Sequence, residues 1–185
     1  MVKVIPWICK KYPKVYWIIG GDGRLKPLLK AMIKKCGLEN RIELLGYVLH
    51  KNVPNVLNRG HIFLNTSITE AFCISALEAA SVGLKVVTTN VGGTPEILPM
   101  DMLTLAEPNS ESLFLNLSKV VTQFLNGEIV DPNEYHLRVK RYYSWEKVAK
   151  RTSKVYQYLY NKGPKKTGFG LITYSSSNLK LIFRS

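Results

Sequence analysis

The stretch from residue 65 to residue 99 reads NTSITEAFCISALEAASVGLKVVTTNVGGTPEILP. It follows a short apolar run, continues through a segment of helical period that contains Glu78, crosses a second apolar run at 85–88 and closes with Gly-Gly-Thr-Pro-Glu. A strand, a helix and another strand in this order are typical of a parallel sheet covered by helices. The stretch therefore predicts an α/β fold.

The same alternation extends on both sides of this stretch. Strands buried on both faces of a sheet are short and rich in Val, Ile, Leu and Phe. Runs of that kind lie at 15–19, 41–45, 61–65, 85–88 and 102–105. The helix expected between the first two should turn one apolar side to the core, made of Leu25, Leu28, Leu29, Met32 and Ile33.

After Pro108 the alternation stops and three helical stretches follow. We expect them at about 110–126, 132–142 and 144–160, the first and third with a serine, Ser110 or Ser144, at the N-cap. The last stretch should dock as a closing helix. Residues 163–185 are expected to form a poorly ordered tail, because two short apolar pieces there are separated by polar residues.

Composition indicates an ordinary globular domain. The chain has 185 residues, 46% of them hydrophobic and 21% charged, which is about one domain's length. The cysteines, Cys9, Cys36 and Cys73, are scattered and lack the spacing of a metal site. We interpret them as buried thiols in a reducing compartment.

The net charge of +13 favours an anionic partner. The lysines are spread over helix faces without a recognised nucleic-acid motif, so DNA or RNA is disfavoured. A phosphate ligand or an anionic lipid surface accounts for the excess equally well. No apolar run reaches the roughly 20 residues that span a bilayer, and the start is broken too soon by Pro6 for a signal sequence, so the chain as written is expected to be soluble.

Several candidate site residues follow predicted strands. Ligands of open α/β sheets bind beyond the carboxyl ends of the strands, where Glu70 and Gly92-Gly93 are expected. The amides of Phe72 and Cys73 should open the helix that follows and suit a phosphate. Seven residues separate Glu70 from Glu78, which places one at the helix entrance and the other two turns inside.

The residues alone leave alternatives open. In a chain with ten glutamates such a spacing also arises by accident, and the pair could be purely structural. Gly20-Gly21-Asp22-Gly23 lacks a third glycine in register, so it predicts a tight strand-to-helix turn at a donor cleft rather than a dinucleotide fingerprint. His50 and His61 are interpreted as a loop residue and a strand residue, not as catalytic bases.

The runs at 70–83 and 86–96 resemble the E-x7-E region of retaining GT-B glycosyltransferases. The runs at 50–53, 60–67 and 70–73 look most like members that begin GPI-anchor synthesis. This resemblance covers about residues 5–160 and is specific over 45–99. It implies a Rossmann-like parallel sheet flanked by helices, forming the C-terminal, nucleotide-sugar-binding domain of a GT-B fold over 1–162.

The resemblance also implies a reaction. N-acetylglucosamine would pass from UDP-GlcNAc to phosphatidylinositol with retention at the anomeric carbon and without a metal or other cofactor. Glu70 would be catalytic and hold donor-sugar hydroxyls, and Glu78 would hold the ribose. The Phe72 and Cys73 amides would lie near the sugar and diphosphate, and Gly46-Tyr47 beside the uracil, with Gly21 in the donor turn.

Family features expected outside the matched region are missing from this sequence. They are the acceptor-binding N-terminal domain, the first central strand with its basic loop, and a membrane-spanning helix after about residue 165. The resemblance thus implies a truncated form, inactive alone, of an enzyme at the cytoplasmic face of the endoplasmic reticulum membrane. The alternative is a non-catalytic interaction module that docks on other subunits of the phosphatidylinositol N-acetylglucosaminyltransferase complex. The missing strand predicts a gap in the sheet and a marginal fold.

Overall fold

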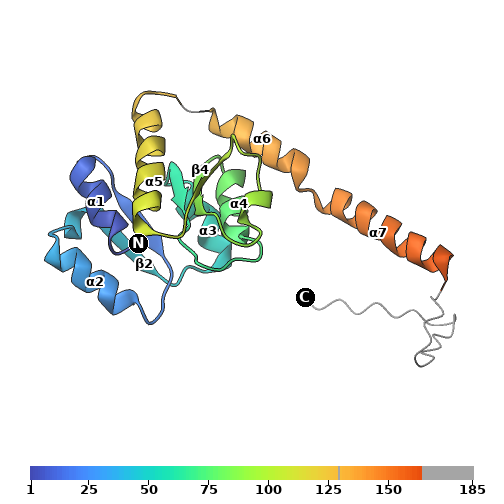
Figure 1. The fold of residues 1–185 in the computed structure, drawn as a ribbon, viewed down its shortest axis with the longest axis horizontal. Helices are drawn as coiled ribbons and strands as arrows, with labels where there is room; N and C mark the ends of the chain where they lie inside the picture. The colour runs from blue at the N-terminus through green and yellow to red at the C-terminus, as the bar shows by residue number, and fades with distance from the viewer. Residues whose placement is uncertain (129, 164–185) are drawn as a thin grey trace. The chain divides into compact units, whose positions relative to one another are not determined.

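The computed structural model describes residues 1–128 and 130–163 (Figure 1). The chain divides into two compact units, Met1–Tyr143 and Ser144–Ser185. All strands described belong to the first unit. The sequence places a domain boundary at residue 162, and the extent of the nucleotide-sugar-binding domain stays a prediction. The expected tail at 163–185 lies, apart from Gly163, outside the described residues.

The strands form two parallel sheets. In the first, β1 (Trp17–Gly20) pairs with β2 (Ile42–Gly46), so that Trp17 lies opposite Ile42. In the second the order is β3-β4-β5, made of Ile62–Leu64, Lys85–Thr89 and Leu103–Ala106. Each strand falls within two residues of its predicted position, and the predicted α/β class is confirmed.

The sheets do not join through the described residues. β1 and β3 each pair on one side only, so both present an edge without a strand partner in that part of the chain. A doubly wound sheet that lacks its first strand has this break between its second and fourth strands. The break lies where the sequence predicts a gap.

Helices cover both sheets. The first unit contains α1 (Val4–Lys11), α2 (Lys26–Lys35), α3 (Val53–Leu57), α4 (Ile74–Ser81), α5 (Ser110–Leu125) and α6 (Pro132–Tyr142), with 3-10 turns η1 (Glu39–Arg41), η2 (His50–Asn52) and η3 (Thr94–Glu96). The second unit contains α7 (Trp145–Lys162). Asn109, not Ser110, caps α5 by accepting from the Ser112 amide, because Ser110 is already helical. Ser144 is the N-cap of α7 but its side chain makes no capping hydrogen bond.

The helix α1 connects the cores of the two sheets. Its Val4 and Ile8 pack with Val87 of β4 and with the buried face of α5, which lies beside α1 in Figure 1. Its Ile5 and Cys9 pack with the core between α2 and the first sheet. A third cluster lies between α4, α6 and the second sheet. All the α1 residues that do this are at most 5% exposed, so α1 holds the divided sheet together.

Two expectations about burial are wrong. Leu25 and Leu28 are 74% and 53% exposed, and only Met32 and Ile33 of α2 are buried, with Leu29 partly so. The physical reason is that α2 begins after Leu25 and that a two-stranded sheet is too narrow to cover the rest of its apolar side. Cys36, expected to be buried, is exposed at the end of α2, whereas Cys9 and Cys73 are buried and all three are free thiols.

In the described residues no helix combines the length and the apolar character needed to cross a bilayer.

Candidate functional site

A backbone hydrogen bond joins the turn after β1 to the turn after β2. The amide of Gly21 donates to the carbonyl of Gly46 at 2.7 Å. The side chain of Asp22 accepts from Lys26 at the same distance, and this hydrogen bond lowers the pKa of the Asp22 carboxyl. The next residue after Gly46, Tyr47, is 75% exposed. The structure therefore brings the predicted residues Gly21, Gly46 and Tyr47 to one edge, the carboxyl ends of β1 and β2.

Asn65 organises the loop that follows β3. Its amide nitrogen donates to Cys73 Sγ at 3.2 Å and to Thr88 Oγ1 at 3.1 Å. Its Oδ1 accepts from the backbone and the hydroxyl of Ser67. One side chain thus connects the end of β3, β4 and the start of α4. The sequence predicts no role for Asn65 beyond ending a strand, although the polar run 65–67 after an apolar strand is a visible signal.

The backbone of Glu70 packs directly on the glycine turn. The Gly93 amide donates to the Glu70 carbonyl at 3.2 Å. A Cβ atom at Gly92, where φ is +51°, would lie 1.8 Å from that carbonyl oxygen, and one at Gly93 would lie 2.2 Å from the Ala71 oxygen. No side chain fits at such distances, so the glycines permit a contact that sets where Glu70 lies.

Hydrogen bonds from two threonine hydroxyls hold the backbone around the Gly92-Gly93 turn. Thr94 is fully buried, and its hydroxyl donates to the Thr89 carbonyl at 2.6 Å and accepts from the Val91 amide. The Thr89 hydroxyl donates to the carbonyl of Ser67. Every one of these polar groups is buried or half-buried and is paired, which favours a single conformation of the turn.

The prediction that the Phe72 and Cys73 amides open the helix is wrong, because α4 begins at Ile74, two residues after Phe72. Cys73 is its N-cap and is 2% exposed, and its carbonyl accepts from the Ala76 and Leu77 amides. Ile74 and Ser75 therefore supply the first-turn amides, and Phe72 and Cys73 precede the helix. Phe72 is 43% exposed and makes an edge contact with Tyr143 at 6.1 Å between ring centroids. The positive end of α4 thus lies beside Phe72, where a phosphate would be stabilised.

Glu78 lies in the second turn of α4, and its side chain is 32% exposed. Its Oε1 is 3.8 Å from Nδ1 of His50, which belongs to η2 in the connection that follows β2. The sequence predicts His50 to be a loop residue and does not connect it with Glu78. The spacing along the chain contains no signal of this contact, because 27 residues separate the two positions.

The two groups of predicted residues share the carboxyl edges of the parallel strands. One group follows β1 and β2, and the other, Glu70, Phe72, Cys73 and Glu78, lies between β3 and β4 in the chain. The contact between His50 and Glu78 connects the groups. Half-buried carboxylates next to helix-terminal amides can bind the hydroxyls and the phosphates of one ligand.

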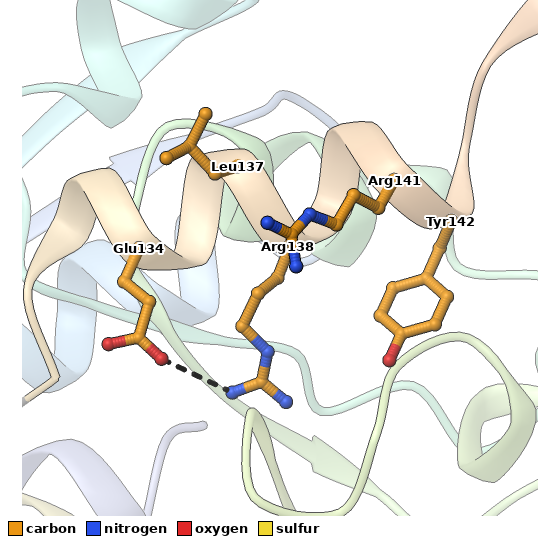
Figure 2. Close-up of a pocket in the computed structure, with 5 residues that line it drawn as sticks. All are labelled: Glu134, Leu137, Arg138, Arg141 and Tyr142. Atoms are coloured by element: carbon orange, nitrogen blue, oxygen red, sulfur yellow. Dashed lines mark ion pairs between the residues drawn. The ribbon is translucent and has the colours of Figure 1, made fainter.

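A separate hollow of about 330 Å³ lies along α6 (Figure 2). Its lining consists of Glu134, Leu137, Arg138, Arg141 and Tyr142, none of them a predicted site residue. Arg138 donates to both oxygens of Asp101, at 2.6 and 2.9 Å, and lies 3.9 Å from Glu134. Asp101 precedes β5, at the amino ends of the strands. The Arg138–Asp101 ion pair attaches α6 to the sheet at that edge.

Comparison with known proteins identifies the family of this arrangement. The family model "Glycosyl transferases group 1" matches residues 1–142. The chain is 48% identical over 153 residues to a human protein named as a subunit of phosphatidylinositol N-acetylglucosaminyltransferase, covering 83% of the chain and 32% of that protein. It is 49% identical over 156 residues to the Arabidopsis thaliana protein of the same name, covering 84% of the chain and 34% of that protein.

Comparison with solved structures shows the same type of fold. The chain superposes on Anabaena HepE, solved in complex with UDP-glucose, with a TM-score of 0.70 and 20% identity, over 84% of this chain and 44% of that one. The chain spans about a third of the length of the curated relatives named above.

Proposed function

The chain belongs to the group 1 glycosyl transferases, and we propose that it carries the donor-binding part of an enzyme that transfers N-acetylglucosamine from UDP-GlcNAc to phosphatidylinositol, the first step of GPI-anchor biosynthesis. The observation that carries this proposal is the construction of the E-x7-E segment. The Gly92-Gly93 turn positions Glu70, and the rigid helix α4 holds Glu78.

The proposed roles follow the polarity of the site. Glu78, half-buried, accepts hydrogen bonds from the ribose hydroxyls, and Glu70 accepts from hydroxyls of the sugar. The segment from Phe72 to the first turn of α4 lies at the diphosphate. Gly21, Gly46 and the exposed ring of Tyr47 flank the uracil from the turns of the other sheet.

These positions suit the charge changes of glycosyl transfer. As the bond to the diphosphate lengthens, the sugar becomes oxocarbenium-like and negative charge builds on the leaving group. Backbone amides fixed at a helix start stabilise that charge without reorganising. The carboxylate of Glu70 orients the sugar and offsets its positive charge. No resident metal is part of this proposal.

Partners and location are proposed on the same basis. The relatives' names describe them as subunits, so we expect other components of a phosphatidylinositol N-acetylglucosaminyltransferase to bind this chain. A lipid acceptor implies work at a membrane, and we expect the cytoplasmic face of the endoplasmic reticulum.

Donor binding tests the proposal without requiring turnover. Titration calorimetry of the full chain with UDP-GlcNAc should show binding that Glu78→Gln weakens about tenfold or more, because a hydrogen bond to a carboxylate contributes about 1.5–3 kcal/mol. Glu43→Gln is the matched control, since Glu43 is a half-exposed carboxylate of β2 paired with Arg59. Equal affinities for the wild-type chain and the folded Glu78→Gln variant would contradict the proposal.

Catalysis is a separate measurement. The change that corresponds to Glu70→Gln can be made in the complexes of the relatives. Unchanged transfer of N-acetylglucosamine would contradict the proposed role of Glu70, whereas a kcat that falls by more than the affinity for UDP-GlcNAc would support it.

A further inference from the structure

The outer faces of α1 and α5 form a shallow hollow of about 690 Å³. Its lining, which we call the α1/α5 patch, consists of Trp7, Lys10, Lys11, Glu111, Phe114 and Leu115. The two helices lie side by side in Figure 1. No residue of the patch belongs to the proposed donor site.

The helical period turns these side chains outward. α1 directs Val4, Ile5, Ile8 and Cys9 to the core, which leaves Trp7 37% exposed on the other side. α5 buries Leu113 and Leu117 and leaves Leu115 66% exposed. Leu115 therefore stays in water although it lies in a helix whose neighbouring apolar residues are in the core.

Packing between the helices fixes the aromatic part of the patch. The rings of Trp7 and Phe114 meet edge to face, with centroids 5.7 Å apart and planes at 76°. The ammonium group of Lys11 lies 5.6 Å from the Phe114 centroid. These contacts hold an apolar surface in place before any partner arrives, so its docking costs little side-chain entropy.

Positive charge surrounds the apolar centre. Lys10 and Lys11 lie at its border, and Lys3 is one turn before Trp7 on the same face of α1. The acidic residue of the patch, Glu111, lies in the first turn of α5, where a negative charge stabilises the helix dipole. The local surplus has the same sign as the charge of +13 on the whole chain.

We propose that the α1/α5 patch docks on an anionic lipid surface. Trp and Leu enter the boundary between headgroups and acyl chains, and lysines lay their apolar stems along it while their ammonium groups reach lipid phosphates. A protein partner fits less well, because lysine is depleted in protein interfaces relative to the rest of the protein surface. The proposal goes beyond donor binding and involves neither Glu70 nor Glu78.

Vesicle co-sedimentation tests the proposal with the full chain. Binding to mixed phosphatidylcholine and phosphatidylserine vesicles should exceed binding to pure phosphatidylcholine and should fall as salt is raised. Lys10→Glu should lower the partition coefficient at least about fivefold, because one lysine near such a surface is worth about that factor. Leu115→Ser should lower it about threefold or more by removing buried apolar area.

Matched controls come from α2. Lys34→Glu is the control for Lys10→Glu, because it makes the same charge change away from the patch. Leu28→Ser is the control for Leu115→Ser, because it removes another exposed leucine. Equal losses of vesicle binding in the patch and control variants would overturn the proposal. So would a wild-type chain that does not bind the anionic vesicles, or a patch that captures a protein partner without binding vesicles. UDP-GlcNAc titration of the same variants separates the two proposals, because failed donor binding with intact vesicle binding contradicts only the proposed function.

Discussion

The middle strand of the three-stranded sheet, β4, is buried along its length except at Lys85, whereas β1 of the two-stranded sheet contains no buried residue and β2 contains one, Ile42. The difference follows from strand number. β4 has a neighbour on each side, while every strand of a two-stranded sheet is an edge. Width therefore decides how completely helices and strands cover one another.

The same contrast divides the candidate site. On the three-stranded side the loops are defined by close backbone contacts, Gly92 on Glu70 and Gly93 on Ala71. On the two-stranded side a Cβ atom at Gly21 would meet no atom within 4 Å, and Tyr47 is 75% exposed. We infer that the residues proposed for the sugar and ribose lie on the rigid side, and those proposed for the base on the more open side.

The largest expected effect comes from the glycine turns. Gly92→Ala should cost more than about 4 kcal/mol of unfolding free energy, because it combines positive φ with a Cβ 1.8 Å from the Glu70 oxygen. Gly21→Ala, also at positive φ but in open space, should cost about 1–3 kcal/mol. Urea unfolding of both variants measures the difference. Similar costs would mean that the Gly92 loop relaxes freely and that the contrast between the sheets is wrong.

The next largest effect is the difference in stability lost when a buried and an exposed leucine are each replaced by alanine. Leu103→Ala, in β5 and 2% exposed, should cost about 2–5 kcal/mol through the cavity it leaves. Leu28→Ala, in α2 and 53% exposed, should change stability by less than about 0.5 kcal/mol. Thermal unfolding of the two variants compares the regions directly. A large loss from Leu28→Ala would show that α2 is covered in solution.

Hydrogen exchange resolves the comparison strand by strand. Amides of Trp17–Gly20 should exchange at least about tenfold faster than those of Val86–Thr89, because strands with few buried contacts open at lower free energy. Mass spectrometry of peptides from the two strands measures the rates. Equal protection would indicate that the free edges of β1 and β3 are paired in solution.

The smallest effect concerns ion pairs. The Arg138 hydrogen bond lowers the pKa of the Asp101 carboxyl below its ordinary value of 3.8. The pair therefore stabilises the fold above that pH and stops doing so as the pH falls through the lowered pKa. Arg138→Gln should reduce the Tm by about 1–3 °C at neutral pH and by less in acid.

Arg59→Gln is the counterpart in the other region, since Arg59 pairs with Glu43 of β2 and both side chains are about half exposed. Its effect on Tm should be smaller than that of Arg138→Gln, because the Arg138 side chain as a whole is 23% exposed. An Arg138→Gln effect that persists unchanged in acid would show that packing, not charge, attaches α6.

Much of the fold and of the candidate site is predictable from local patterns. Apolar runs bounded by turn residues locate each strand within two residues, and the helical period locates α6 at its observed bounds. The spacing of Glu70 and Glu78 predicts one residue before α4 and one inside it. These features depend on neighbours within a few residues, which is why the chain alone contains them.

Contacts between distant segments are not predictable in this way. Nothing local indicates that Asn65 bonds to Cys73 and Thr88, or that His50 approaches Glu78. The exposure of Leu25, Leu28 and Cys36 also differs from expectation, because helical period defines a face but not the width of what covers it. Sequence by itself determined the order and type of the elements and the carboxylate pair. Tertiary structure decided which side chains are covered and how the loops meet, since both depend on the space left between segments that the chain brings together only on folding.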